Sequence, residues 1–97
     1  MKKIHFVLAM LFFVSFDAFS DSASEYLDSA SIKQSRRDSD GALVDCNKSI
    51  KANPYYADAY LFRAEIERKT GDADHAMADY NKAIDLNPSF ASYLRQS

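Results

Sequence analysis

The chain has 97 residues and a formal net charge of −2, with one cysteine, two glycines and two prolines. This mildly acidic, mixed-sign composition argues against nucleic acid as a partner, because DNA and RNA are bound through excess positive charge. A single cysteine excludes an intrachain disulfide framework, and two isolated glycines exclude a glycine-rich phosphate loop. A chain of this length forms at most one small domain with a modest core.

The N-terminal segment has the three parts of a secretory signal peptide. Two lysines follow the initiating methionine, an apolar run extends over residues 6–16, and Ala18 and Ser20 place small residues two positions apart,. The apolar run is shorter than the roughly 20 residues that span a bilayer, so a cleaved signal is favoured over a membrane anchor. We expect signal peptide 1–20, a mature domain at residues 21–97, and a periplasmic or secreted location, between which the sequence does not decide.

The remaining sequence repeats itself with a period of 34 residues. Residues 23–56 and 57–90 align without a gap and are identical at fourteen positions. The identical pairs are Ala23/Ala57, Tyr26/Tyr60, Leu27/Leu61, Ala30/Ala64, Ile32/Ile66, Asp38/Asp72, Asp40/Asp74, Ala42/Ala76, Asp45/Asp79, Asn47/Asn81, Lys48/Lys82, Ile50/Ile84, Asn53/Asn87 and Pro54/Pro88. Self-similarity at a fixed period of this length indicates a repeat protein.

Each unit is predicted to form two helices joined by a turn. In the first unit we expect helices at about residues 24–36 and 42–52. In the second unit, residues 57–69 contain good helix formers and no breaker,. The helix that follows carries an apolar stripe from Ala76 to Ile84 at three- and four-residue steps. An Asn-Pro pair closes each unit, because the residue before proline is pushed out of helical geometry.

Two aspartates lie in the turn of each unit. Gly71 stands where a helix ends in a left-handed residue, and Arg37 stands at the same position of the first unit. The aspartates can accept hydrogen bonds from the free N–H groups of the next helix; they are Asp38, Asp40, Asp72 and Asp74. A calcium loop that opened at Asp38 would need a glutamate at its twelfth position, where Ser49 stands. We therefore expect helix caps rather than a metal site.

The second unit resembles the tetratricopeptide repeat, a helix–turn–helix unit of 34 residues. The resemblance rests on Tyr60, Ala64, Gly71-Asp72, Ala76, Tyr80, Ala83 and Pro88. The first unit is similar through Tyr26, Ala30, Ala42 and Pro54, with Cys46, Ser49 and Arg37 replacing the aromatic, the second alanine and the turn glycine. Small residues at such positions let helices pack closely. The resemblance implies an all-α fold of two stacked helix–turn–helix repeats in a short right-handed superhelix, with residues 91–97 as a truncated C-terminal capping helix.

The mature sequence offers no convergent set of catalytic groups. We expect His75 on the outer surface and Cys46 at an inward position, so that a nucleophile–base pair does not form. Cys46 is interpreted as a small buried apolar group, with an intermolecular disulfide as the alternative. The aromatic residues are interpreted as packing groups rather than as a carbohydrate- or base-stacking platform; they are Tyr55, Tyr56, Tyr60, Phe62, Tyr80, Phe90 and Tyr93. The prediction is a protein that is not an enzyme and has no cofactor or metal.

The resemblance implies a module that binds a protein or peptide in a groove lined by the first helix of each repeat. The candidate groove residues implied in this way are Ser24, Leu27, Ser31, Gln34, Asp58, Leu61, Glu65 and Arg68. Only Arg68 is basic among them, which disfavours a clamp for a C-terminal carboxylate. The alternative interpretation of these residues is an ordinary solvated helix face.

The C-terminal edge supports a second interpretation. Tyr93 and Leu94 look like the start of another first helix, and repeat arrays need a polar cap over the last hairpin. We therefore expect exposed apolar surface that a second copy or a partner covers. Three functions stay open: an exported adaptor that uses the groove, a structural or accessory subunit that assembles through this edge, and a truncated relic of a longer array. The sequence does not name the partner or the oligomeric state.

Overall fold

The computed structural model describes residues 22–96, so the predicted signal peptide lies outside the described residues. Within that range the chain is helical apart from its turns and contains no strand. The first helix covers residues 22–35, and it is followed by α2 (Ser39–Ala52), α3 (Ala57–Lys69), α4 (Ala73–Leu86) and α5 (Phe90–Gln96). None of the described helices is long and apolar enough to cross a membrane.

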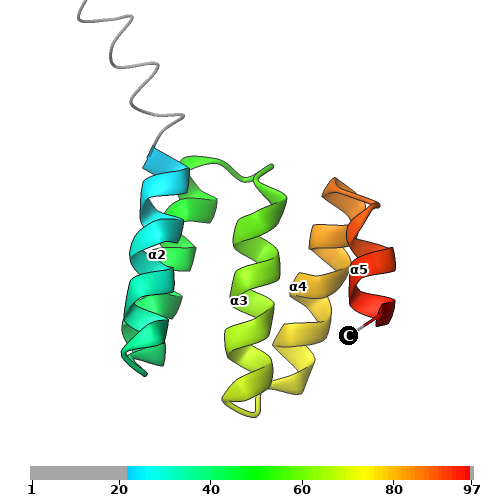
Figure 1. Ribbon diagram of the computed structural model, residues 1–97. Helices are drawn as coiled ribbons and strands as arrows, with labels where there is room; N and C mark the ends of the chain where they lie inside the picture. The colour runs from blue at the N-terminus through cyan, green and yellow to red at the C-terminus, as the bar shows by residue number, and fades with distance from the viewer. Residues whose placement is uncertain (1–21, 97) are drawn as a thin grey trace, which may run out of the picture.

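The helices form two hairpins that stand side by side and are followed by α5 (Figure 1). The first helix pairs with α2, and α3 pairs with α4. In Figure 1, α3 stands between the first hairpin and α4, and it packs on both α4 and α2. The predicted all-α fold of two stacked helical hairpins with a short C-terminal helix is confirmed.

Small residues bring the helices close together, and a few larger ones fill the space between the hairpins. Ile66 and Cys46 are 1% and 0% exposed, and they form the core cluster with Ala30 and Ala42. Leu27, Leu43 and Phe62 pack around this cluster. The core role expected of Tyr60 is confirmed, because this side chain is buried and its hydroxyl donates to the Pro54 carbonyl at 2.9 Å. Tyr80, expected in the core as well, is only half-buried.

The turns of both hairpins have the same hydrogen-bond pattern and the same left-handed residue. The Asp38 amide donates to the Lys33 carbonyl at 2.9 Å, and the Asp72 amide donates to the Glu67 carbonyl at 2.8 Å. Such bonds close a Schellman motif, which needs positive φ at the residue before the aspartate. That residue is Gly71 in the second hairpin, with φ 91°, and Arg37 in the first, with φ 64°. An arginine therefore occupies a conformation that glycine adopts without steric cost.

The aspartates cap the second helices, but not all four in the same way. Asp38 is the N-cap of α2 and accepts from the Gly41 amide at 3.0 Å, and Asp72 is the N-cap of α4 and accepts from the His75 amide at 3.3 Å. Asp40 and Asp74 lie in the first turns. The expected start of the helix at residue 42 was wrong, since the Asp38 cap places the first helical residue at position 39.

Replacing Arg37 by glycine is expected to stabilise the protein. The left-handed conformation costs an L-residue roughly 1–2 kcal/mol, and the greater freedom of glycine in the unfolded chain cancels about 0.5–1 kcal/mol of the gain. Urea denaturation should therefore show a net gain of about 0.5–1 kcal/mol in the free energy of unfolding. The matched variant Gly71→Arg should lose stability. An unchanged or lower stability of Arg37→Gly would show that the turn carries no backbone strain.

Candidate functional site

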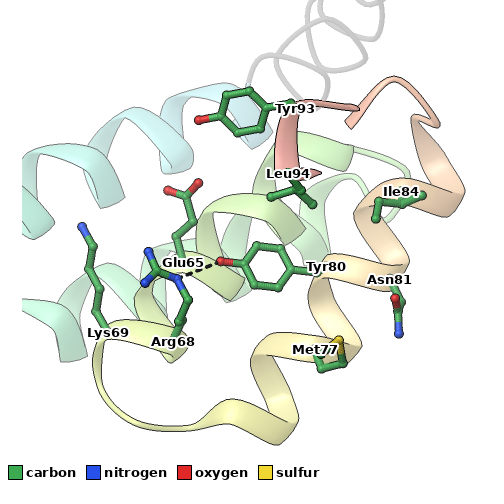
Figure 2. A pocket seen from close by; sticks show the side chains of 9 residues that line it. All are labelled: Glu65, Arg68, Lys69, Met77, Tyr80, Asn81, Ile84, Tyr93 and Leu94. Carbon is green, nitrogen blue, oxygen red and sulfur yellow. Dashed lines mark hydrogen bonds between the residues drawn. The ribbon is translucent and has the colours of Figure 1, made fainter. Parts of the chain in front are cut away.

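A cavity of about 620 Å³ lies between α3, α4 and α5. Figure 2 shows the nine side chains that surround it, drawn from three helices. They are Glu65, Arg68 and Lys69 from α3, Met77, Tyr80, Asn81 and Ile84 from α4, and Tyr93 and Leu94 from α5. The volume is in the range of protein ligand sites, which are typically concave and apolar with a few polar groups.

The cavity has an apolar floor and a charged wall. The ring of Tyr80 reaches from α4 toward α3, where Arg68 Nε donates to its hydroxyl oxygen at 3.2 Å (Figure 2). Met77 and Tyr93 are 62% and 56% exposed, although both are large apolar side chains. On the α3 side, Arg68 and Lys69 stand beside Glu65, which gives this wall an excess of positive charge. An apolar surface next to fixed charges suits an amphipathic partner rather than a small apolar molecule.

Two of the eight predicted groove residues lie at this cavity. Glu65 and Arg68 line the cavity. Leu27 packs against the core, and Gln34 accepts a hydrogen bond from the Ser39 hydroxyl at 3.1 Å. The other four do not line the cavity: Ser24, Ser31 and Asp58 are exposed and Leu61 is half-buried.

The predicted edge residues meet the end of the predicted groove. Tyr93 and Leu94 close the cavity opposite Glu65 and Arg68 (Figure 2). Two interpretations that the sequence kept apart, a groove and an assembly edge, thus share one surface in this fold. Sequence reasoning missed the α4 floor, namely Met77, Asn81, Ile84 and the exposed part of Tyr80. The alignment of the two units could have predicted this floor. Its residues stand 34 positions after the residues of α2 that face α3.

One buried aspartate recurs in both units with different partners. Asp79 is 6% exposed and accepts from Arg63 Nε and Nη2, each at 2.7 Å. Arg63 Nη1 also donates to Asn47 Oδ1 at 2.9 Å, so this guanidinium joins α2, α3 and α4. Asp45, the equivalent residue in the first unit, is 3% exposed and accepts from Ser29 Oγ at 2.6 Å and Lys33 Nζ at 2.9 Å.

These partners hold both aspartates in the ionised form. The hydrogen bond from Ser29 lowers the pKa of Asp45 against the opposing effect of burial, and Lys33 lowers it further,. Burial acts to raise the pKa of Asp79, but the hydrogen bonds from Arg63 and Glu67 outweigh it and leave the pKa below its ordinary value. Each carboxylate is paired with side chains of its own hairpin, so we assign both aspartates a structural role.

A third carboxyl group near this network is held partly neutral. Burial, followed by a hydrogen bond to Asp79, raises the pKa of Glu67 to about 7. Glu67, Asp72 and His75 offer metal-ligating atoms within 4.8 Å of one another. Asp72 already caps α4, and its Oδ2 lies 2.7 Å from His75 Nδ1, which raises the pKa of the exposed imidazole. The absence of a metal site stays a prediction from the sequence.

Cys46 lies at the centre of the core. The side chain is 0% exposed, and burial raises the pKa of the thiol to about 12. A thiolate is the species that attacks a disulfide, so this thiol is unreactive and out of reach while the protein is folded. The structure agrees with a small buried group and disfavours an intermolecular disulfide at this residue.

Comparison with known proteins assigns the fold to the class of helical repeat proteins. Residues 57–90 match the family model described as "Tetratricopeptide repeat". Thirty-four chains of solved structures match the fold. A crystal structure of MamA superposes with a TM-score of 0.70 at 29% sequence identity, over 71% of this chain and 40% of the MamA chain. The chain thus spans less than half the length of that protein. A comparison with curated protein sequences finds no significant match.

Replacing Glu67 by glutamine is expected to change how stability depends on pH. The pKa of Glu67 is about 7 in the folded protein and near 4.5 otherwise. The folded state therefore binds more protons between these values, and the wild type loses stability as the pH rises from about 4.5 to about 7. Glutamine removes this loss. The variant should match the wild type near pH 4 and exceed it at pH 8 by on the order of 1 kcal/mol, discounted because the side chain is partly exposed.

The measurement is urea denaturation of both proteins from pH 4 to pH 8, with the difference between them plotted against pH. Taking the difference removes the contributions of all other titrating groups that the substitution leaves unchanged. A difference that is independent of pH would show that Glu67 titrates alike in the folded and unfolded chains.

Proposed function

We propose that the protein is an exported, non-catalytic interaction module that binds a protein or peptide at the cavity between α3, α4 and α5. The observation that carries the proposal is an open cavity of about 620 Å³ with an apolar floor and charged residues on one wall. The tetratricopeptide repeat at residues 57–90 supports it, since domains with this repeat bind proteins or peptides.

The chemistry of the cavity supports binding rather than catalysis. Its lining contains no histidine or cysteine, and the strongly shifted groups Glu67 and Cys46 lie outside it. Catalytic sites bring perturbed groups together in the cleft that holds the substrate. Here the groups that face the cavity are those that recognise a surface, namely Tyr80, Met77 and Arg68, residue types that are enriched at protein interfaces.

A structural or accessory subunit is the second candidate function, and it uses the same surface. The exposed Tyr93 and the half-buried Leu94 favour it, because they extend the apolar floor to the edge of the described chain. A relic of a longer array is the third candidate. The three candidate functions differ in what covers the cavity. A binding module would bind its partner reversibly, a subunit would stay bound to its partner, and a relic would have no partner.

A photo-crosslinking amino acid tests the binding site. p-Benzoyl-phenylalanine at Met77 should give a cross-linked adduct with a partner in the native host, because this side chain is 62% exposed at the cavity. The matched control is Val44, which is 51% exposed on α2 and does not line the cavity. Adding Arg68→Glu should reduce the adduct at position 77 several-fold. Adducts of equal yield at 44 and 77, or none at 77, would contradict the proposal.

Export is tested by the mass of the protein recovered from its host. We expect a mature N-terminus at Asp21, since Ala18 and Ser20 match the small residues that a signal peptidase requires. Intact-mass spectrometry and fractionation of periplasm and culture fluid measure both the cleavage and the location. A full-length protein that retains Met1 and stays with the cytoplasmic fraction would overturn export while leaving the binding site untouched.

A further inference from the structure

The floor of the cavity repeats a surface that is already covered elsewhere in the same chain. Met77, Tyr80, Asn81 and Ile84 stand 34 residues after Leu43, Cys46, Asn47 and Ile50. In the first hairpin this face of α2 lies against α3. Cys46 is 0% exposed, and Leu43 packs against the core cluster that contains Ile66 of α3.

The contacts of α3 on α2 show what this face accepts. Ile66 shares the core cluster with Ala42 and Cys46 of α2, and Phe62, one helical turn earlier, packs against this cluster. Arg63 Nη1 donates to Asn47 Oδ1 at 2.9 Å. A helix with apolar residues at positions i and i+4 and a hydrogen-bond donor at i+1 therefore fits this surface. Asn81 presents on α4 the amide that Asn47 presents on α2.

In the described chain, α5 covers only part of the equivalent face on α4. Seven residues form α5 and thirteen form α3. Tyr93 and Leu94 stand at one end of the cavity, while Met77 at the other end is 62% exposed, although its counterpart Leu43 is partly buried. The uncovered part is the region that the second half of α3, from Arg63 to Lys69, occupies on α2.

We infer that the cavity is a seat for an amphipathic helix of a partner protein, which lies on α4 as α3 lies on α2. This inference rests on the proposed function and specifies its ligand: apolar side chains one helical turn apart toward Met77 and Ile84, a donor toward Asn81, and carboxylates toward Arg68 and Lys69. The charge preference follows from the two cations against one acid on the α3 wall,.

A second copy of this chain is the weaker occupant, because neither its first helix nor its α3 offers the required face. The pattern belongs to α3, whose Ile66 is 1% exposed and whose Phe62 already packs against the core cluster of its own chain. The first helix has the exposed Ile32 at the position of Ile66, but Asp28 replaces Phe62. A carboxylate at that position would face the apolar floor without a partner, which is unfavourable.

The proposed helix-binding surface on α4 is tested by extending α5, so that a helix of the same chain covers it. Ser97 is replaced by a copy of the segment Arg63–Lys69, which continues α5 in the register of α3. A control extension carries aspartate in place of the copied isoleucine. A third version carries alanine there, because Tyr80 is larger than Cys46 and leaves less room. We expect the isoleucine or the alanine extension to raise Tm by about 5–10 °C over the aspartate control.

The same extensions, combined with the photo-crosslinker at Met77, connect the seat to the partner. A seated extension should reduce the adduct at least ten-fold, whereas the aspartate extension should leave it. If neither extension raises Tm above the control, the helix seat is wrong, and adducts from the unextended chain still uphold the proposed function. If an extension raises Tm but the unextended chain gives no adduct, the seat stands and the proposed function fails. An adduct with twice the mass of the chain would identify a second copy and overturn the inference of a partner protein.

Discussion

Each hairpin in this fold depends on the next helix along the chain to cover its outer face. A helical hairpin buries the surface between its own two helices, but the far side of its second helix stays open until another helix packs on it. In the first hairpin α3 meets this need, and Cys46 on α2 is fully buried as a result. In the second hairpin α5 meets it only in part, and Met77 stays exposed. The same constraint that builds the core therefore creates the candidate binding surface.

Arg63 gives the stacking its fixed geometry. Its two bonds to Asp79 hold α3 on α4, and its bond to Asn47 holds α3 on α2. A bidentate arginine–carboxylate pair is directional as well as strong, so one side chain sets the relation between three helices. The first unit has Ser29 at this position, which pairs with Asp45 but is too short to reach beyond its own hairpin. This difference between Ser29 and Arg63 fits their positions in the fold. Only the second unit has a described hairpin before it that a longer side chain can reach.

Much of the fold followed from the 34-residue repeat, because period, helix formers and breakers are local properties of the chain. The bounds of α3 and the role of Asp72 as a cap were predictable for that reason. The start of α2 was missed by three residues, since cap choice between Asp38 and Asp40 depends on backbone geometry that the sequence does not state. The buried pairs of Asp45 and Asp79 were missed because charged residues on a helix are ordinarily solvated. Their recurrence at one position was the available signal.

Several residues of the candidate site could be predicted from the sequence, but not that they surround a single cavity. Glu65 and Arg68 were expected in a groove, and Tyr93 and Leu94 at an edge, but only the packing of α5 on α4 brings them around one cavity. A sequence difference between the two units makes this face of α4 differ from the equivalent face of α2. Where α2 presents the small Cys46 to a helix of its own chain, α4 presents Tyr80, whose hydroxyl is tied to Arg68. A position that serves the core in one unit thus lies in the floor of the cavity in the other, so the candidate site is built from the face of α4 that corresponds to the covered face of α2.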